Sequence, residues 1–570
     1  MDLLRPNSAI RSFNGCWTCR LRRKKCDEKH PVCGVCSALR ITCHFGQEKP
    51  DWMDGGVRQE EMAERLKREV REKAQQRREG RDARISSGHT SGTEPTADLH
   101  TDGIDGIEPS RGDFGCTLTS NHPTNFGRSD SIFLIFYLEH VFPFLFPFYR
   151  PSIYQGGKAW VLEMMMSRPV VRQAALCQSS YFFSLVRGTA NHDVVWETVL
   201  AQTRHAFGVL RQALQVVSGS DITQHLHGAV RILASIMQVQ RFEIAVLSFN
   251  NFQAHLSAAS ALFRQLLDGP GAVDPGEPIS RFNSLVSLLE PPPPVFPADV
   301  VQIPSAEQAA FRFSSALLIF DDIIASTVLQ EQPRLYDYYT SLLTDTNGAD
   351  PPINLEAVVG CQNWALVQIS EIAALDTWKQ RCKRAGNLDV MELVHSAAII
   401  KDSLESNLTR LETNPITTSN DDNGCLDALI TGQCQRSKSL SSQSSLATRI
   451  WAHAALLYLF IVVSGWQPAN FEVRYHVGQI IDLLTHQISP PALLRTMVWP
   501  FCVAGCLAEP AQEARFREMV NGLQPASVFG IVRKALEIME NVWGTRDARD
   551  ATNRDLAACF KIQGDIVLLI

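Results

Sequence analysis

Three features of this 570-residue sequence predict its fold class: six regularly spaced cysteines near the N-terminus, a proline-free charged segment behind them, and apolar segments of helical period from residue 129 onward. Together they predict a small zinc-nucleated module and a large all-α domain of stacked helices, joined by a charged helix and a disordered linker. A chain of this length exceeds what one hydrophobic core holds, so several structural units are expected.

Residues 1–15 form a short polar arm, which we expect to be disordered. No signal peptide is indicated, because Met1 to Lys25 has no continuous apolar core and becomes basic toward its end. Fifteen cysteines are an odd number for a disulfide framework. Reduced thiols inside the cell are therefore expected.

Charge is distributed unevenly along the chain. Residues 1–84 carry 20 Lys and Arg against 13 Asp and Glu, whereas the remainder carries 34 against 47. A basic head on an acidic body predicts a polyanionic partner for the head alone. For residues 57–84 taken separately, a solvated helix face is the simpler interpretation.

The candidate metal ligands occupy residues 16–43 with the spacing C-x2-C-x6-C-x6-C-x2-C-x6-C: Cys16, Cys19, Cys26, Cys33, Cys36 and Cys43. A redox site of the thioredoxin type would follow a strand, and independent core cysteines would not repeat one spacing twice. Paired C-x2-C motifs at short separation are typical zinc ligands. Two tetrahedral zinc ions need eight ligand positions and six thiolates supply six, so two thiolates must bridge both ions.

A basic run separates the second cysteine from the third and carries the candidate DNA contacts: Arg20, Arg22, Arg23, Lys24 and Lys25. We expect a short helix after each C-x2-C, so that these side chains project from about two helical turns. Arginine can bond the O6/N7 edge of guanine with two hydrogen bonds, whereas phosphate contacts give affinity without sequence. The run predicts double-stranded DNA as partner, and for any single residue a phosphate contact or a nuclear-import signal is the alternative.

The module resembles the fungal Zn2Cys6, or zinc binuclear cluster, family of transcription factors. Besides the cysteines and the basic run, Asp27 after the third cysteine and Pro31 in the connecting loop carry this resemblance. The resemblance implies two Zn2+ ions bridged by Cys16 and Cys33. The remaining cysteines would complete one zinc site each, as pairs: Cys19 with Cys26, and Cys36 with Cys43.

The same resemblance implies that residues three and four positions after the second cysteine read a CGG-like half-site. Those positions are Arg22 and Arg23. Many family members carry Lys at one or both, so which base each residue reads stays open. A 28-residue module has too little core to fold alone, so zinc binding is expected to supply its folding free energy.

Residues 44–84 are predicted to form a turn and then a basic, charged helix from about residue 57. The best heptad register places three residues inside before it breaks: Ala63, Leu66 and Val70. This seam is too short for a sustained coiled coil, so a charged spacer is favoured and a homodimer stays the alternative. The turn at Trp52 resembles the subgroup of Zn2Cys6 regulators related to those of sexual development.

Residues 85–128 are rich in Ser, Gly, Thr, Asp and His and are predicted to be a disordered linker. Residues 129–570 are predicted to form an all-helical regulatory domain with a disordered insertion near 413–445. The apolar run 446–464 is about one turn short of a membrane span, so we expect a core helix and no membrane. The segments starting at Trp451 and Trp499 resemble the fungus-specific transcription-factor domain that follows such clusters.

No phosphate loop, nucleophile elbow, H-E-x-x-H motif or deaminase signature occurs in the sequence, which favours a protein without enzymatic activity. The predicted function is zinc-dependent, sequence-specific DNA binding that regulates RNA polymerase II transcription in the nucleus. The transcription machinery or co-regulators are the expected protein partners, and a secondary-metabolite gene cluster or developmental genes the expected targets. The alternative is an effector-binding or protein-interaction helical protein whose zinc module serves as a tether.

Overall fold

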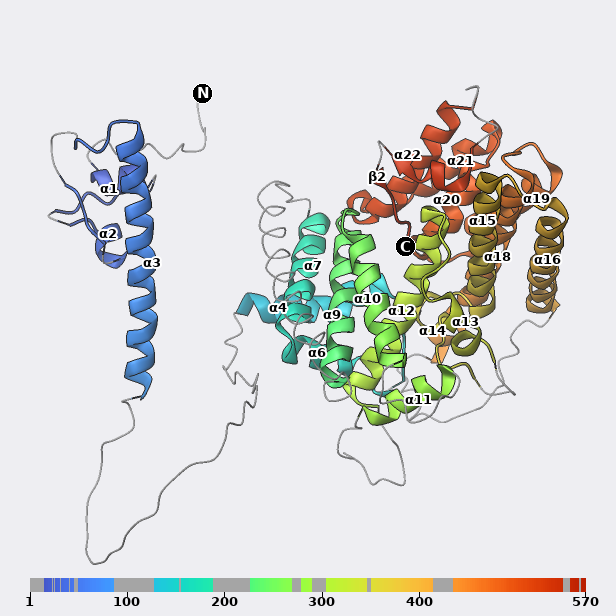
Figure 1. Ribbon diagram of the computed structural model, residues 1–570, viewed down its shortest axis with the longest axis horizontal. Helices are drawn as coiled ribbons and strands as arrows, with labels where there is room; N and C mark the ends of the chain where they lie inside the picture. Colours follow the sequence, from blue (N-terminus) through green and yellow to red (C-terminus); the bar gives the residue numbers. More distant parts are fainter. Residues whose placement is uncertain are drawn as a thin grey trace, which may run out of the picture. The chain divides into compact units, whose positions relative to one another are not determined.

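The computed structural model describes residues 15–22, 24, 26–30, 32–39, 41–45, 50–86, 128–152, 155–187, 226–268, 278–289, 304–345, 350–413, 434–546, 554–562 and 565–570. The chain divides into two compact units, Met1–Ser120 and Asn121–Ile570, each of which is considered by itself (Figure 1). Nearly all of the predicted N-terminal arm and of the predicted linker at 85–128 lies outside the described residues.

In the described part of the first unit there are two short helices and one long helix: α1 (Trp17–Leu21), α2 (Gly34–Leu39) and α3 (Val57–Ser86). The turn before α3 depends on Asp54, whose Oδ1 accepts hydrogen bonds from the backbone N–H groups of Gly56 (2.8 Å) and Gln59 (3.3 Å). Gly55 has φ +84°, a left-handed conformation that glycine adopts without strain. This turn satisfies backbone donors at the start of α3 and so fixes where the charged helix begins.

The second unit is a body of packed helices. Its N-terminal part comprises α4 (Arg128–Phe136), a π-helical turn (Tyr137–Val141), α5 (Phe142–Leu145), α6 (Ala159–Ser167), α7 (Pro169–Arg187), α9 (Leu226–Ala245), α10 (Phe252–Asp268) and α11 (Pro278–Leu288). Its middle comprises α12 (Ala306–Leu329), α13 (Tyr336–Leu343), α14 (Glu356–Val359), α15 (Asn363–Ala385), α16 (Val390–Thr413) and α18 (Cys434–Ser464).

The C-terminal part of the body comprises α19 (Phe471–Asp482), a π-helical turn (Leu483–Gln487), a 3-10 helix (Pro491–Met497), α20 (Val498–Cys506), α21 (Pro510–Asn521), a second 3-10 helix (Ala526–Phe529), α22 (Gly530–Gly544) and α23 (Leu556–Cys559). Two strands of two residues, β1 (Lys561–Ile562) and β2 (Asp565–Ile566), pair antiparallel with Lys561 opposite Ile566. The structure confirms the all-α class but differs from the all-helical prediction at this hairpin.

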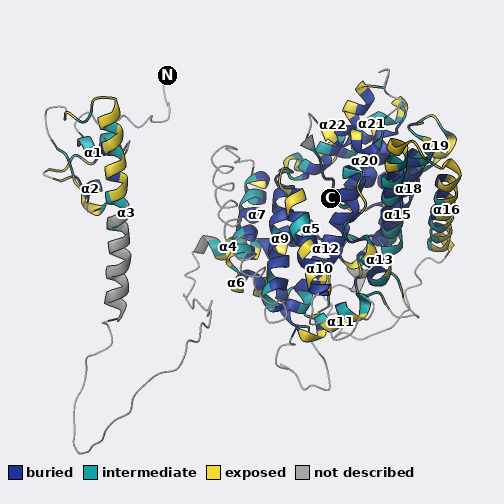
Figure 2. Cartoon of the chain, viewed as in Figure 1, coloured by how far each residue is buried: buried dark blue, intermediate teal, exposed yellow. Residues whose placement is uncertain are grey.

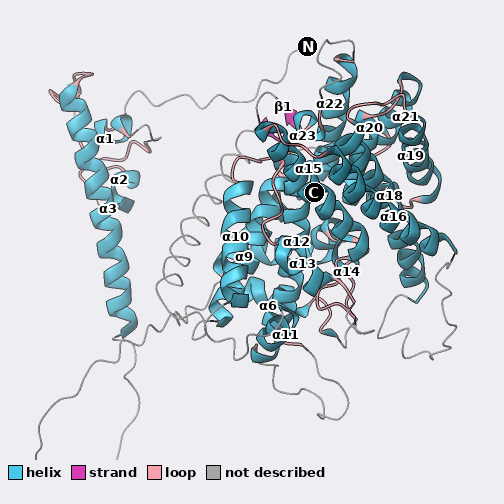
Figure 3. Cartoon of the chain, turned by 45° about the vertical axis from the view of Figure 1, so that its right-hand side comes forward, coloured by secondary structure: helices cyan, strands magenta, loops and turns pink. Residues whose placement is uncertain are grey.

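Helix α12 lies at the centre of the body and is buried along almost its whole length, as Figure 2 shows. It begins at a capping box in which the Ser305 hydroxyl accepts from the Gln308 N–H and the Gln308 side chain accepts from the Ser305 N–H. The aromatic core includes Trp451 and Trp499, whose rings stack at 5.6 Å with an interplanar angle of 4°. Figure 3 shows from a second side that the described part of the body is built almost entirely of helices.

Helix α18 extends further toward the N-terminus than the sequence suggested. It begins at Cys434, so residues 434–445 are helical, whereas the predicted insertion near 413–445 included them; residues 414–433 lie outside the described part. Two buried polar side chains in this stretch are satisfied by hydrogen bonds. Gln443 Nε2 donates to the Gln487 carbonyl (3.2 Å), and Ser444 Oγ donates to Glu356 Oε1 (2.6 Å). Tertiary contacts therefore outweigh the low apolar content that predicted disorder.

Residues Ser442–Ser464 of α18 are the one stretch, among the described helices, that is long and apolar enough to cross a membrane. Most of that stretch is buried inside the body, against α15, α16, α19 and α20. This burial is what a core helix of a packed domain requires.

Candidate metal centre and nucleic-acid interface

The six cysteines of the first unit gather their sulfur atoms into two overlapping groups. One group contains Cys16, Cys19, Cys26 and Cys33, and the other contains Cys16, Cys33, Cys36 and Cys43; within each, the Sγ atoms lie within 4.8 Å of one another. The shared residues, Cys16 and Cys33, are those that the resemblance assigned as bridging ligands. The structure therefore places four thiols around each of two positions and two thiols at both.

The spacing of these sulfur atoms suits tetrahedral zinc. Zinc–sulfur bonds of about 2.3 Å in a tetrahedron place the sulfur ligands about 3.8 Å apart. The Sγ–Sγ distance is 3.7 Å between Cys16 and Cys33, 3.6 Å between Cys19 and Cys33, and 3.9 Å between Cys16 and Cys36. All but Cys43 are buried, and Cys43 is half-buried. The donor set thus fits a binuclear zinc cluster in number, chemistry and spacing.

The two halves of the module repeat one hydrogen-bond pattern at an offset of 17 residues. In the first half, Cys16 Sγ accepts from the Cys19 N–H (3.3 Å); in the second, Cys33 Sγ accepts from the Cys36 N–H (3.3 Å). The third cysteine of each half behaves alike, because Cys26 Sγ accepts from the Cys16 N–H (3.4 Å) and Cys43 Sγ from the Cys33 N–H (3.5 Å). Backbone donors orient the sulfur ligands and stabilise their ionised form.

The pKa values of the thiols reflect this crowding. Burial raises the pKa of Cys16 far above its ordinary value. Burial also opposes ionisation of Cys33, but the backbone N–H of Cys36 and the adjacent thiols outweigh it and lower the pKa of Cys33 to about 6. Sulfur atoms this close together favour a bound cation, because thiolates repel one another unless a cation lies between them.

Asp27 connects the two halves. Its carboxylate accepts from the Gly34 N–H through Oδ1 (2.8 Å) and Oδ2 (3.1 Å) at the start of α2. A Cβ at position 34 would lie 2.5 Å from Asp27 Oδ2, so glycine permits this close approach. The residue that follows the third cysteine therefore fixes the second helix relative to the first half of the module.

The predicted DNA-contacting residues start within α1. The Arg20 guanidinium lies 4.5 Å from the ring centre of the half-buried Trp17, a cation–π contact that orients it. Arg22 is half-buried at the C-terminal cap of α1, and Lys24 is exposed. Arg23 and Lys25 lie outside the described residues. The end of α1 thus brings part of the basic run to one edge of the module.

Helix α3 packs on the module, a contact that the sequence did not reveal. Glu69 Oε1 accepts from both the Thr42 N–H (2.8 Å) and the Thr42 hydroxyl (2.9 Å). Leu66 is only 1% exposed, Met62 is also buried, and Val70 packs against the cysteine core. The predicted heptad seam comprises Ala63, Leu66 and Val70, with a charged spacer favoured over a coiled coil; two of these three residues, Leu66 and Val70, are covered within the unit itself.

A thiol cluster that carries a basic helix, in a chain with a large helical body, defines a metal-nucleated DNA-binding regulator. Residues 14–52 match the model of the fungal Zn(2)-Cys(6) binuclear cluster domain, and residues 132–569 match that of the fungal specific transcription factor domain. The chain belongs to this family of fungal transcription factors. It is a DNA-binding transcription regulator with a zinc cluster domain, and not an enzyme.

Similar proteins extend over almost the whole chain. The transcription factor dibT of Pestalotiopsis microspora is 35% identical, with 98% of this chain and 99% of dibT covered. The pestheic acid cluster transcriptional regulator 3 of Pestalotiopsis fici is 28% identical over 95% of this chain and 96% of its own. The ustiloxin B cluster transcription factor ustR of Aspergillus flavus is 26% identical with the same coverage. No solved structure matches the chain.

Proposed function

We propose that the chain binds two zinc ions through its six N-terminal cysteines and reads a CGG-like half-site in DNA, thereby regulating RNA polymerase II transcription in the nucleus. The observation that carries this proposal is the pair of four-thiol groups that share Cys16 and Cys33. Bound zinc would neutralise the thiolates and hold α1 in place. The contacts to DNA would come from the basic run at the end of α1 and directly after it.

The residues assigned to DNA have different roles in this proposal. Arg22 and Arg23 contact base edges, because arginine forms two parallel hydrogen bonds with guanine. Arg20, Lys24 and Lys25 contact phosphates and set the register of the module on the duplex. Exposed basic residues of α3, such as Arg68, add affinity without sequence preference.

The target genes are proposed to be a secondary-metabolite biosynthetic cluster. The names of several similar proteins support this: two refer to the pestheic acid and ustiloxin B clusters, and a third refers to trichothecene biosynthesis. Developmental genes, which the resemblance to regulators of sexual development suggested, are the second candidate. The helical body is proposed to contact the transcription machinery or co-regulators.

A gel-shift titration of the full-length, zinc-loaded chain on CGG-containing and scrambled duplexes tests the proposal. We expect Arg22→Ala to reduce the preference for CGG by about 1–3 kcal/mol. The matched control is Arg68→Ala, which should weaken binding to both duplexes equally and reduce the slope of affinity against salt by about 1. Equal binding to both duplexes by the unsubstituted chain would refute sequence-specific reading and favour the tether alternative.

A further inference from the structure

Two arginine side chains lie near each other inside the helical body. Arg241 belongs to α9, and Arg495 belongs to the 3-10 helix Pro491–Met497. Only 11% of the Arg241 side chain is exposed. Burial and the nearby charge of Arg241 lower the pKa of Arg495 to about 9, so this guanidinium is still protonated at neutral pH. Two positive charges are therefore held where little water solvates them.

A single carboxylate compensates these two charges within the described residues. Asp321 of α12 is buried and pairs with Arg241 Nη2. Arg495 has no ion pair with an acidic side chain in the described part of the chain. Its Nη2 donates instead to the carbonyls of Phe144 (3.0 Å) and Leu145 (2.6 Å). The cluster thus carries one positive charge in excess, which is costly in the interior of a protein.

Both arginines line a small cavity of about 40 Å³. Gly530 and Ile531, the first residues of α22, line it as well, and Phe529 at the start of that helix provides no side-chain cap. The N-terminus of a helix carries partial positive charge. Apolar residues contribute to the rest of the lining: Phe182, Ile244, Val528 and Ile570. The charged side chains that line the cavity are both positive, which favours an anion as its occupant.

Unused hydrogen-bond donors on both arginines support the same conclusion. The Nε atoms of Arg241 and Arg495 are buried, and neither has a hydrogen-bond partner among the described residues. A guanidinium has five N–H donors, yet within the described structure each of these arginines hydrogen-bonds through Nη2 alone. Buried donors without acceptors are costly. An anion with several oxygen atoms supplies acceptors and negative charge together.

The volume of the cavity limits the size of the occupant. One water molecule needs about 10–15 Å³ of such a volume, so 40 Å³ holds about three water-sized groups. This space suits a small oxyanion. The simpler alternative is that water fills the cavity and Arg495 serves only to bind the carbonyls at the end of α5.

We propose that this cavity binds a small oxyanion, either phosphate or a carboxylate, between Arg241 and Arg495. The anion would connect α9, the 3-10 helix Pro491–Met497 and the start of α22, which are far apart in the sequence. The stability of the body would then depend on the concentration of the anion. The inference concerns the body alone and does not depend on which bases or metal ions the module binds.

Urea denaturation of the full-length, zinc-loaded chain in increasing phosphate, and separately in increasing acetate, at constant ionic strength tests the proposal. We expect the transition midpoint of the body to rise with the anion, because a ligand that binds only the folded state stabilises it. Arg495→Met removes the excess charge and should lose this dependence. The matched control is Arg533→Gln, which removes an exposed arginine of α22 outside the cavity lining and should keep it.

General effects of the salt on stability, and anion binding by the basic run near the zinc cluster, are common to all three proteins. The difference between them therefore reports on the cavity. Isothermal titration calorimetry with phosphate and acetate adds a second measurement. Arg495→Lys keeps the charge but loses the forked geometry, and it should weaken anion binding by about tenfold or more.

The outcomes separate the alternatives. A response to both anions supports a site for carboxylates as well as phosphate, and a response to phosphate alone supports a site for phosphoryl groups. An equal anion dependence in Arg495→Met and the unsubstituted chain would overturn the proposal and leave water as the occupant. Loss of the dependence in Arg533→Gln would overturn it as well. If circular dichroism shows that Arg495→Met is unfolded, an unchanged anion affinity in Arg495→Lys decides against the proposal.

Discussion

The two units of this protein have cores of opposite character. The core of the zinc unit consists of five cysteines and Ile41, with a few partly buried apolar residues around them. The core of the body is built from aliphatic and aromatic side chains, including the stacked Trp451 and Trp499. Apolar burial stabilises the second unit, whereas the first buries mainly sulfur atoms and needs a cation to hold them.

This contrast implies that the two units respond to different perturbations. A chelator should act on the first and leave the second intact, whereas a cavity in an apolar core should do the reverse. The contrast also explains the packing of α3, because Leu66 and Met62 supply apolar surface that the module itself lacks.

Zinc removal should have the largest effect. We expect excess chelator to unfold the module and abolish DNA binding, since binding of structural zinc contributes about 10–16 kcal/mol in small zinc domains. The thermal transition of the body should remain unchanged. Near- and far-ultraviolet circular dichroism during calorimetry separates the two transitions, and a shift of both together would contradict the independence of the units.

Single cysteine substitutions sharpen the same test. Cys33 belongs to both four-thiol groups and Cys43 to one. Cys33→Ser should therefore reduce the zinc content by more than Cys43→Ser does, which native mass spectrometry measures. Equal losses would mean that the sulfur atoms are not shared between two ions.

An aromatic truncation should have the next largest effect, confined to the body. Trp499→Ala removes the stacked ring and its hydrogen bond from Nε1 to Thr327 Oγ1 (2.9 Å), at a cost of about 3–5 kcal/mol. Trp451→Phe is the matched control, because within the described residues the Trp451 Nε1 has no hydrogen-bond partner. Trp451→Phe should lower the free energy of unfolding clearly less than Trp499→Ala, as measured by chemical denaturation. Altered zinc content in either variant would contradict the independence of the two units.

The sequence predicted the first unit better than the second, for a physical reason. Metal ligands at fixed short spacing determine a local geometry, so two metal positions that share two thiols could be anticipated from the ligand count, and the resemblance to the Zn2Cys6 family implied that the shared pair is Cys16 and Cys33. The burial of Leu66 and the hydrogen bonds from Thr42 to Glu69 could not be anticipated, because a short apolar stripe does not say which surface covers it. The same limit applied to Gln443 and Ser444, whose burial depends on hydrogen bonds to segments far along the chain.

Mild acid should destabilise the body through two buried histidines. His453 and His476 face each other with 3.0 Å between their Nδ1 atoms, and burial lowers the pKa of His453 to about 3 and of His476 to about 4. Unfolded histidine takes up a proton near pH 6.5, so stability is complete above that pH and falls below it. As the pH falls from 7.5 to 5.5, the two histidines together should lower the free energy of unfolding of the body by about 2–3 kcal/mol.

Urea denaturation at several pH values measures this loss. The variant His476→Leu should roughly halve the pH dependence, since one titrating group remains. An unchanged pH dependence in that variant would assign the acid sensitivity to other groups. The unfolding of the zinc unit must be followed separately in these experiments, because acid also protonates thiolates and releases the metal.

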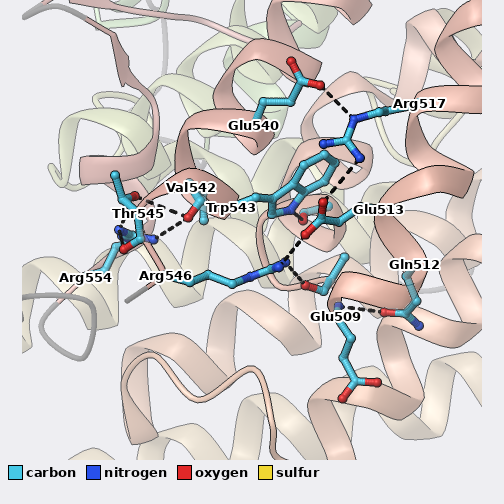
Figure 4. Close-up of polar contacts among 12 residues, drawn as sticks. Glu509, Gln512, Glu513, Arg517, Glu540, Val542, Trp543, Thr545, Arg546 and Arg554 are labelled. Atoms are coloured by element: carbon cyan, nitrogen blue, oxygen red, sulfur yellow. Dashed lines mark hydrogen bonds and ion pairs between the residues drawn. The ribbon is translucent and has the colours of Figure 1, made fainter. Parts of the chain in front are cut away.

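The smallest effect is expected at the surface of the body, where Arg517 joins α21 to α22 (Figure 4). Its Nε donates to Glu540 Oε1 at 2.9 Å, and its guanidinium lies 4.7 Å from the Trp543 ring centre. Glu540→Ala removes only the exposed ion pair with Arg517 and should lower the free energy of unfolding only slightly, and less at high salt. Arg517→Ala also removes the ion pair with Glu513 (3.3 Å) and the contact with Trp543, so it should destabilise the body more, and the part due to the Trp543 contact should persist at high salt. Urea denaturation at high salt measures the free energy of unfolding of both variants. Equal values would mean that the aromatic contact with Trp543 adds nothing at the edge of the body. The contrast between an apolar body and a metal-dependent unit would then be weaker.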